Sequence, residues 1–184
     1  MPNQEYPTVD ELCKQLLTDK HLYENAERLL QLCSELKIVS KRAARNSYYF
    51  LYKSKYVFKF YLSSTLSYKG FDKVDHSNSL HVSLSVGNIK KENPEQFLSS
   101  LPNDLRTEYL SSPTTHCRRC SRSYTSCPYH FLEYEENTRK YPLCTNSYGY
   151  RRFNPNVEQF SMIERFIKLR VKNIDEQSIK QRTK

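Results

Sequence analysis

Glycine is scarce in this chain and tryptophan is absent: the 184 residues include three glycines and no Trp. A loop that holds phosphates through its backbone amides needs closely spaced glycines, so we expect no nucleotide-hydrolysing site of that kind. The same scarcity excludes collagen-like and other low-complexity classes. The chain also lacks an apolar run of membrane-spanning length, and its first residues show neither the basic nor the apolar segment of a secretion signal. We therefore predict a cytoplasmic protein with no membrane partner.

Aromatic residues supply most of the large side chains that can form a core. The chain has fifteen tyrosines and nine phenylalanines, and 38% of its residues are hydrophobic. This content suffices for one core, so we predict one domain over residues 1–175 and a flexible tail over 176–184. The expected parts are a helical hairpin over 1–45, a sheet region over 46–115, a cysteine-rich loop with strands over 116–153 and a terminal helix over 154–175.

Positive charge is in excess, because 29 Lys and Arg stand against 20 Asp and Glu and give a net charge of +9. Such a balance permits an anionic partner, either a nucleic acid or an acidic ligand. A solvated basic surface that keeps the protein soluble would explain the same charge.

The N-terminal part predicts two amphipathic helices. A capping box, Thr8-Val9-Asp10-Glu11, opens the first helix, which we expect to end near residue 19. A second apolar stripe of helical period runs over about residues 21–37. Cys13 and Cys33 fall on these stripes, where a free cysteine packs as a small hydrophobe, so we predict that both are core residues.

The period then changes to that of strands. Aromatic and β-branched runs over 47–52 and 56–62 flank Lys53-Ser54-Lys55 and predict a hairpin whose turn lacks the usual Asn-Gly pair. From Leu80 to Val86 apolar and polar residues alternate, which predicts a strand with one buried face. Short helices over 94–100 and 103–111 follow, and residues 131–134 and 148–153 are further strand candidates.

The terminal helix is predicted from a start signal, Asn154-Pro155-Asn156, and from an apolar stripe that runs to about residue 175. Together these segments predict a two-layer α+β fold. The helical hairpin and the terminal helix pack on one face of an antiparallel sheet, and the other face stays open.

Four of the six cysteines gather in the C-terminal half. Cys117-x2-Cys120 and Cys127-x2-His130 each have the spacing that aims two soft ligands at one ion, and Cys144 follows. In a reducing compartment this clustering favours a closed structural Zn²⁺ site, with Cys117, Cys120, Cys127 and either Cys144 or His130 as ligands. Free thiols, or disulfides within the same set, are the alternative.

Three arginines lie among these cysteines. Arg118, Arg119 and Arg122 would offset the negative charge of a four-thiolate zinc site, and we also name them as candidate anion-binding residues.

The cysteine spacing, the run from Arg139 to Cys144 and the Asn154-Pro155 helix start resemble a group of small bacterial proteins, mostly of the Firmicutes type. These have helices first, then a Tyr- and Lys-rich hairpin, a four-cysteine cluster and an Asn-Pro helix start. The resemblance covers most of the chain in order. It implies that Cys144 is the fourth zinc ligand, and it implies no activity.

No motif fixes a catalytic site. His81, Ser83 and Ser85 share the polar face of one strand, but no nucleophile motif accompanies them, so we name no catalytic residue. The tyrosines and lysines of the predicted hairpin, Tyr48, Tyr52, Tyr56, Tyr61, Lys53, Lys55 and Lys59, have the composition of a base-stacking surface. Ordinary packing in a half-buried sheet also accounts for them, and it is the interpretation we favour.

We therefore predict a zinc-stabilised, non-enzymatic binding module that engages an anionic partner through its open sheet face or its basic loop. The alternative is a small-molecule sensor or small enzyme with a pocket between sheet and helices.

Overall fold

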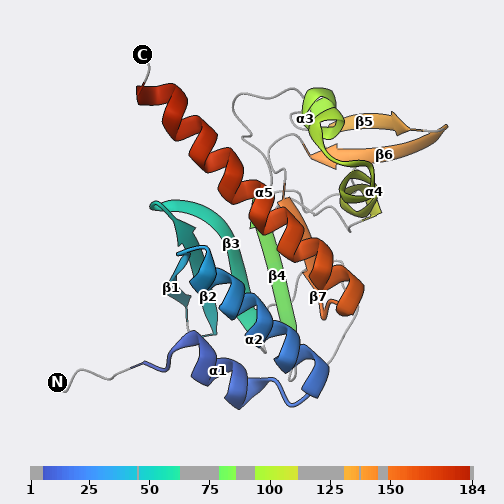
Figure 1. The fold of residues 1–184 in the computed structure, drawn as a ribbon. Coiled ribbons are helices and arrows are strands. Elements are labelled where there is room, and N and C mark those ends of the chain that lie inside the picture. Colours follow the sequence, from blue (N-terminus) through green and yellow to red (C-terminus); the bar gives the residue numbers. More distant parts are fainter. Residues whose placement is uncertain are drawn as a thin grey trace.

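The computed structural model of the chain describes residues 6–44, 46–62, 79–85, 94–111, 131–136, 138–144 and 149–182. It confirms a mixed α+β fold (Figure 1). The described helices are α1 (Val9–Leu16), α2 (Lys20–Glu35), α3 (Pro94–Ser100), α4 (Asn103–Ser111) and α5 (Val157–Arg182).

The main sheet is antiparallel and has the strand order β1-β2-β3-β4-β7. The chain reaches β7 only after α3, α4 and a separate two-stranded ribbon, so residues from the middle and the end of the sequence become neighbours in this sheet (Figure 1). Its strands are β1 (Val39–Ala44), β2 (Ser47–Tyr52), β3 (Lys55–Leu62), β4 (Leu80–Ser85) and β7 (Gly149–Phe153). The ribbon pairs β5 (Phe131–Glu136) with β6 (Arg139–Cys144).

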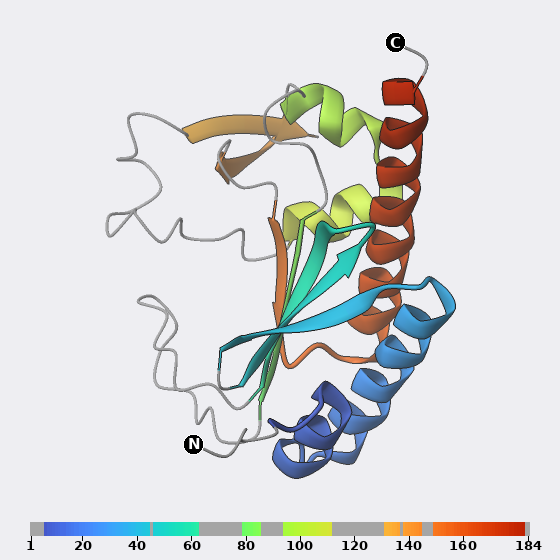
Figure 2. The same ribbon diagram turned by 90° about the vertical axis from the view of Figure 1, so that its left-hand side faces the viewer.

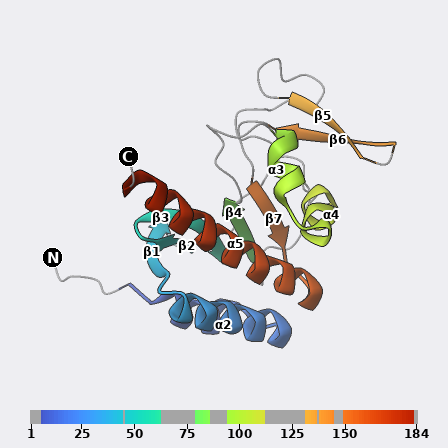
Figure 3. The same ribbon diagram turned by 45° about the horizontal axis from the view of Figure 1, so that its top comes forward.

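Helices cover one face of the main sheet. Figure 2 views the sheet edge-on and shows α2 and α5 on the same side of it. The two helices lie next to each other along this side (Figure 3), where Arg28 of α2 forms an ion pair with Glu164 of α5 at 2.5 Å. The other face carries none of the described helices, as the alternation in the sequence predicted.

The core fills the layer between helices and sheet with large apolar side chains that are fully shielded from solvent. Phe50 and Phe58 are stacked with their ring centroids 4.1 Å apart. The ring centroids of Tyr150 and of Phe166 on α5 are 4.7 Å apart. Burying an aromatic side chain of this size contributes roughly 2–3 kcal/mol, so this layer is the main source of stability.

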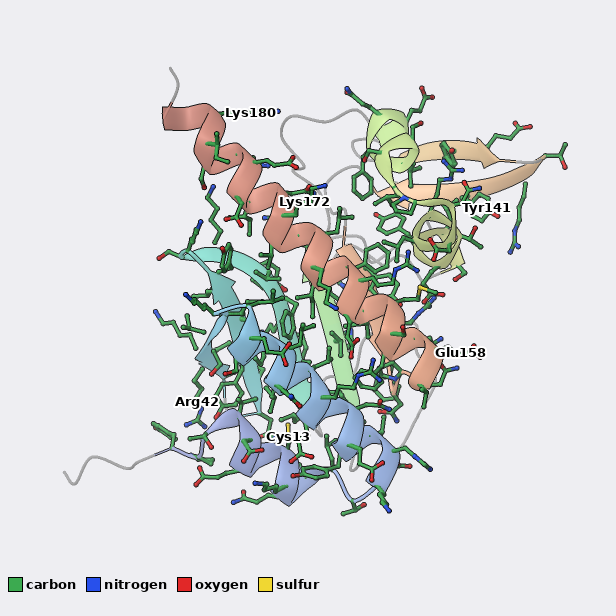
Figure 4. All side chains as sticks on the ribbon, in the orientation of Figure 1. Cys13, Arg42, Tyr141, Glu158, Lys172 and Lys180 are labelled. Carbon is green, nitrogen blue, oxygen red and sulfur yellow. The ribbon has the colours of Figure 1, made fainter. Side chains whose placement is uncertain are left out.

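Cys13 and Cys33 are core residues, which confirms the prediction for both. They are 0% and 4% exposed, and burial raises the pKa of each thiol to about 12. The side chain of Cys13 lies at the inner side of α1 (Figure 4). Both thiols therefore stay protonated at neutral pH and are poor metal ligands.

The starts of α1 and α5 follow the predicted capping signals. Thr8 and Glu11 form the capping box of α1, since the Glu11 backbone amide donates to the Thr8 hydroxyl and the Glu11 carboxylate accepts from the Thr8 amide. At α5 the Gln159 amide donates to the Asn156 side chain at 2.8 Å. Each cap satisfies backbone donors that the first helical turn leaves without partners.

Helix α5 continues beyond the predicted end at residue 175, because its last residues form helix to Arg182. We expected residues 176–184 to be a flexible tail. No proline or glycine stops the helix there, and Ser178 donates its hydroxyl to the Ile174 carbonyl at 2.8 Å, which leaves the helical ladder intact. Among the described helices, none is both long and apolar enough to cross a membrane.

Two strands were not predicted. Strand β1 is polar and mostly exposed, and it forms because β2 offers its backbone to an edge partner. Strand β6 contains Pro142, which argues against a central strand but is tolerated in a two-stranded ribbon, where each strand is an edge.

The hairpin turn between β2 and β3 forms without glycine. Lys53 and Ser54 both adopt positive φ, 48° and 62°, which a two-residue hairpin turn of this hand demands. Lys53 is held by Asp175 of α5, whose carboxylate accepts a hydrogen bond from the Lys53 ammonium at 2.7 Å. A tertiary contact from a distant helix thus supports a turn that local sequence does not favour.

Candidate anion-binding face of the sheet

The five strands of the main sheet contain basic residues and no acidic ones. None of their residues is Asp or Glu, although the whole chain has 20 acidic residues. Successive side chains of a strand point to opposite faces, so the strand register assigns each residue to the helix-covered face or to the helix-free face. On the helix-covered face Arg152 pairs with Glu108 of α4. The helix-free face receives no carboxylate from the sheet itself.

One row of cross-strand neighbours on the helix-free face carries three cations, and we call it the cationic row. The register aligns its members across all five strands, with one residue from each. Neighbouring strands lie about 4.8 Å apart, so consecutive cations of the row are roughly 10 Å apart. The cationic row consists of Lys41 (β1), Tyr49 (β2), Lys59 (β3), Ser83 (β4) and Arg151 (β7).

Lys59 is the centre of the cationic row and is 9% exposed. Its ammonium lies 4.7 Å from the centroid of the Tyr49 ring and 4.1 Å from that of the Tyr61 ring. The negative ring faces attract a cation, by about 2 kcal/mol or more where water is excluded. Two tyrosines therefore hold a charged group in place at the middle of the sheet.

A second row runs beside the first and is aromatic. Tyr61 (β3), His81 (β4) and Phe153 (β7) are cross-strand neighbours, two residues along each strand from the cationic row, and we call them the aromatic row. The Tyr61 and His81 rings are stacked, with centroids 5.1 Å apart and planes at 20°. Because residues two apart on a strand are about 7 Å apart, the two rows lie side by side on one face.

Tyr56, near the start of β3, contacts residues of both neighbouring strands. Its hydroxyl donates to the Ser83 carbonyl at 2.9 Å, and its ring meets the Tyr49 ring edge to face at 5.8 Å. Burial raises the pKa of the Tyr56 hydroxyl well above its usual range, so it stays a neutral donor. It acts as a structural support for Tyr49, which at 39% exposure is accessible to a partner.

His81 is held neutral. Burial is the largest cause that lowers its pKa to about 4, and the neighbouring Arg151 and Lys59 charges lower it further. At neutral pH the ring therefore carries no charge.

We expect stability to fall as pH drops from about 6.5 toward 4. The unfolded chain binds a proton at His81 near pH 6.5, whereas the folded chain resists it until about pH 4, so acid favours unfolding in that window. The full shift corresponds to about 3 kcal/mol, and partial exposure of the ring reduces this. Urea titrations of wild type and His81→Gln at pH 7.0 and 4.5 measure the effect.

The variant should lose less stability than wild type between the two pH values. His21→Gln is the matched control, since His21 is exposed on α2. An equal pH response in wild type and in His81→Gln would contradict the argument.

The predicted cysteine and arginine sites lie outside the described residues. This applies to the candidate ligands Cys117, Cys120, Cys127 and His130 and to the side chain of Cys144, whose backbone forms the end of β6. The three loop arginines, Arg118, Arg119 and Arg122, are likewise outside them. Within the described part of the chain, no three His, Cys, Asp or Glu side chains gather as a metal site would require.

Sequence reasoning grouped the hairpin tyrosines together, and the structure separates them. Tyr48 faces the helices and is 4% exposed, whereas Tyr49, Tyr56 and Tyr61 contribute to the helix-free face. Tyr48 and Tyr49 face opposite sides because adjacent residues of a strand alternate, and the shift of register between Phe50 and Leu51 lets Tyr56 share a side with Tyr61. Arg151 and Phe153 were missed because their alignment with Lys59 and Tyr61 depends on which strands pair.

Comparison of the chain with protein-family models, with curated proteins and with solved structures finds no match. The resemblance to small Firmicutes-type proteins therefore stays a prediction. Any function has to be argued from the side chains of the sheet face.

Proposed function

We propose that this protein is a non-enzymatic binding module whose helix-free sheet face engages an anionic partner. The cationic row supports this proposal: three cations lie on one face of a sheet whose strands contain no carboxylate. Basic side chains gathered on one face attract an anionic partner through their combined field.

The environment of Lys59 strengthens the argument. Lys59 is 9% exposed, so the residue is shielded from most of the surrounding water, and its ammonium lies over the rings of Tyr49 and Tyr61. A cation–π contact offsets only part of the lost hydration. An anionic ligand group would supply the stronger interaction, and fixed ring positions make the ammonium ready to receive it.

The layer between sheet and helices does not favour the alternative of a small-molecule sensor or enzyme. Its described side chains, among them Phe58, Phe60 and Phe166, are 0% exposed and pack on one another. A ligand pocket needs space and convergent polar groups, and this part of the layer is filled with apolar atoms.

The cysteine-rich segment completes the proposal. A structural zinc held by Cys117, Cys120, Cys127 and either Cys144 or His130 would fasten this segment, and the metal would supply folding energy but no chemistry. Arg118, Arg119 and Arg122 would add a second basic surface for the same partner. These assignments are supported by the spacing of the residues in the sequence.

Replacement of Lys59 should weaken binding of polyanions. We expect Lys59→Met to lower the affinity for polyphosphate and for a single-stranded oligonucleotide about 5–10-fold and to reduce the slope of log affinity against log salt by about one. Methionine keeps the volume between the tyrosine rings, so the fold is preserved. Fluorescence anisotropy at several salt concentrations measures both quantities.

Lys172→Met is the control, because Lys172 is an exposed lysine on α5 (Figure 4). It carries the same charge as Lys59 and lies on the helix that covers the opposite face of the sheet. A salt-independent affinity, or an equal loss in both variants, would count against the sheet face as the binding surface.

A further inference from the structure

We infer that the outer edge of β1 binds a short acidic segment of a partner protein, which adds to the main sheet as a further antiparallel strand. This edge is separate from the surface of the proposed function, since it consists of backbone groups and not of the side chains of the helix-free face. Two observations carry the inference: the edge is exposed to solvent, and the side chains along it are basic and apolar.

The two edges of the main sheet differ in burial. Among the described strands, β1 and β7 each have one neighbour in this sheet, and β1 lies at its outer end (Figure 1). Every residue of β7 is buried or half-buried, whereas Val39, Ser40 and Lys41 of β1 are exposed in succession. Every second residue of an antiparallel strand directs its N–H and C=O away from its neighbour, so an exposed end strand offers these groups to another strand.

The regular part of this edge is short. Residues 39–42 pair with β2 in register, and a shift of register follows between Arg42 and Ala44. Beyond the shift, Nε of Arg42 donates a hydrogen bond to the Ala44 carbonyl at 3.3 Å. A bulge of this kind interrupts the row of backbone groups that a new strand needs. The edge therefore fits an extended segment of about 4–6 residues and no long strand.

The side chains of β1 select what pairs there. Val39 and Lys41 are two residues apart and point to the same side, and Val39 is 61% exposed although it is apolar. Residues opposite them on an added strand would lie about 5 Å away, where an apolar partner suits Val39 and a carboxylate suits Lys41. In an antiparallel strand these two partners follow each other in the order acidic, any residue, apolar.

Charge argues for an acidic segment and against a second copy of this chain. Lys37, Lys41 and Arg42 lie in or next to β1, and residues 36–62 include no Asp or Glu. Pairing of two β1 strands would bring the same cations together, and the net charge of +9 adds repulsion between copies. An acidic segment has the complementary charge.

The experiment uses end-blocked, fluorescent peptides of about eight residues that are threonine except for one glutamate and one valine, in the order glutamate, threonine, valine. A second peptide has lysine in place of the glutamate. Two more carry N-methyl groups on alternate residues, one on the odd and one on the even positions, so each lacks the backbone donors of one edge only. Anisotropy titrations with the full chain measure their affinities.

We expect the glutamate peptide to bind about 5-fold or more tightly than the lysine peptide. One N-methylated peptide should lose binding and the other should stay within about 2-fold of the parent, because only one edge of the peptide faces β1. Lys41→Glu should reverse the preference between the glutamate and lysine peptides. Lys168→Glu is the matched control and should keep the preference, since Lys168 is exposed on α5. Thermal melting verifies the fold of each variant.

Equal affinity for the glutamate and lysine peptides, or equal effects of the two N-methylation patterns, would overturn the inference. A stable dimer of the free protein whose β1 amides resist hydrogen exchange would assign the edge to a second copy and overturn it as well. Lys59→Met should bind the glutamate peptide within about 2-fold of wild type, and a loss as large as that in Lys41→Glu would place the peptide on the cationic row instead. Failure at the edge leaves polyanion binding by the helix-free face standing, so the two proposals can fail separately.

Discussion

Replacing Arg152 by Met is expected to destabilise the protein by about 3–5 kcal/mol, because it leaves the carboxylate of Glu108 without its counter-ion in a shielded site. The two side chains are 9% and 18% exposed, and Nη2 of Arg152 lies 2.6 Å from Oε1 of Glu108. Urea unfolding at pH 7 measures the loss. A protein of this size is stable by only about 5–15 kcal/mol, so the variant would be near the limit of folding.

The size of the effect comes from a connected hydrogen-bond network. Oε1 of Glu108 accepts hydrogen bonds from Nε and Nη2 of Arg152 and from the Tyr150 hydroxyl at 2.5 Å, and Nη2 also donates to the Ser111 hydroxyl at 3.0 Å. Burial and the bond to Glu108 raise the pKa of Tyr150 far above its usual range. The network joins β7 to α4, so its loss also loosens the attachment of that helix.

A second substitution tests the cause. Glu108→Gln in the Arg152→Met background removes the charge and keeps an acceptor for Tyr150, so we expect the double variant to recover a large part of the loss. Lys53→Met is the control, because the exposed pair Lys53–Asp175 should be worth only about 0–1 kcal/mol. If Arg152→Met costs no more than Lys53→Met, the pair contributes little to the fold.

Removal of the proposed zinc is the second change for which we expect a large effect. Zinc binding by small structural modules supplies about 10–16 kcal/mol of apparent free energy, so a chelator should unfold the cysteine-rich segment. Elemental analysis of protein purified without added metal should find one zinc per chain. A thiol assay should detect four additional reactive cysteines after chelation if Cys144 is the fourth ligand, and three if His130 is. Cys117→Ser should be insoluble or partly unfolded.

The fourth ligand is decided by a matched pair of variants. If Cys144 binds the metal, Cys144→Ser should lower zinc affinity by several orders of magnitude and His130→Ala should leave it nearly unchanged. If His130 binds the metal, His130→Ala should lower zinc affinity by several orders of magnitude and Cys144→Ser should leave it nearly unchanged. Metal-free protein with all cysteines reactive at once, or with disulfides in a reducing buffer, would remove zinc from the proposal.

Much of the α+β fold was predictable because it depends on local patterns. Thr8 with Glu11 and Asn156 before α5 satisfy backbone amides close in sequence, so the helix starts followed from residue types. The alternation from Leu80 onward also showed which face of β4 is buried. Cys13 and Cys33 were recognised as core residues for the same reason.

Pairing between distant segments was not predictable. Strand β1 exists because β2 supplies a partner, and the Lys53-Ser54 turn forms with help from Asp175 of α5. Neither interaction leaves a local signature, since each depends on residues that only the folded chain brings together. The extension of α5 to Arg182 has a local cause instead, since no proline or glycine stops the helix there.

By itself the sequence determined the net positive charge, the helix starts, the periodicity of the strands and the cysteine spacing. Only the tertiary structure decided that Lys59, Ser83 and Arg151, and beside them Tyr61, His81 and Phe153, align across β3, β4 and β7. The reason is physical: period and capping depend on neighbours a few residues away, whereas a row across a sheet depends on register between strands that are far apart in the chain.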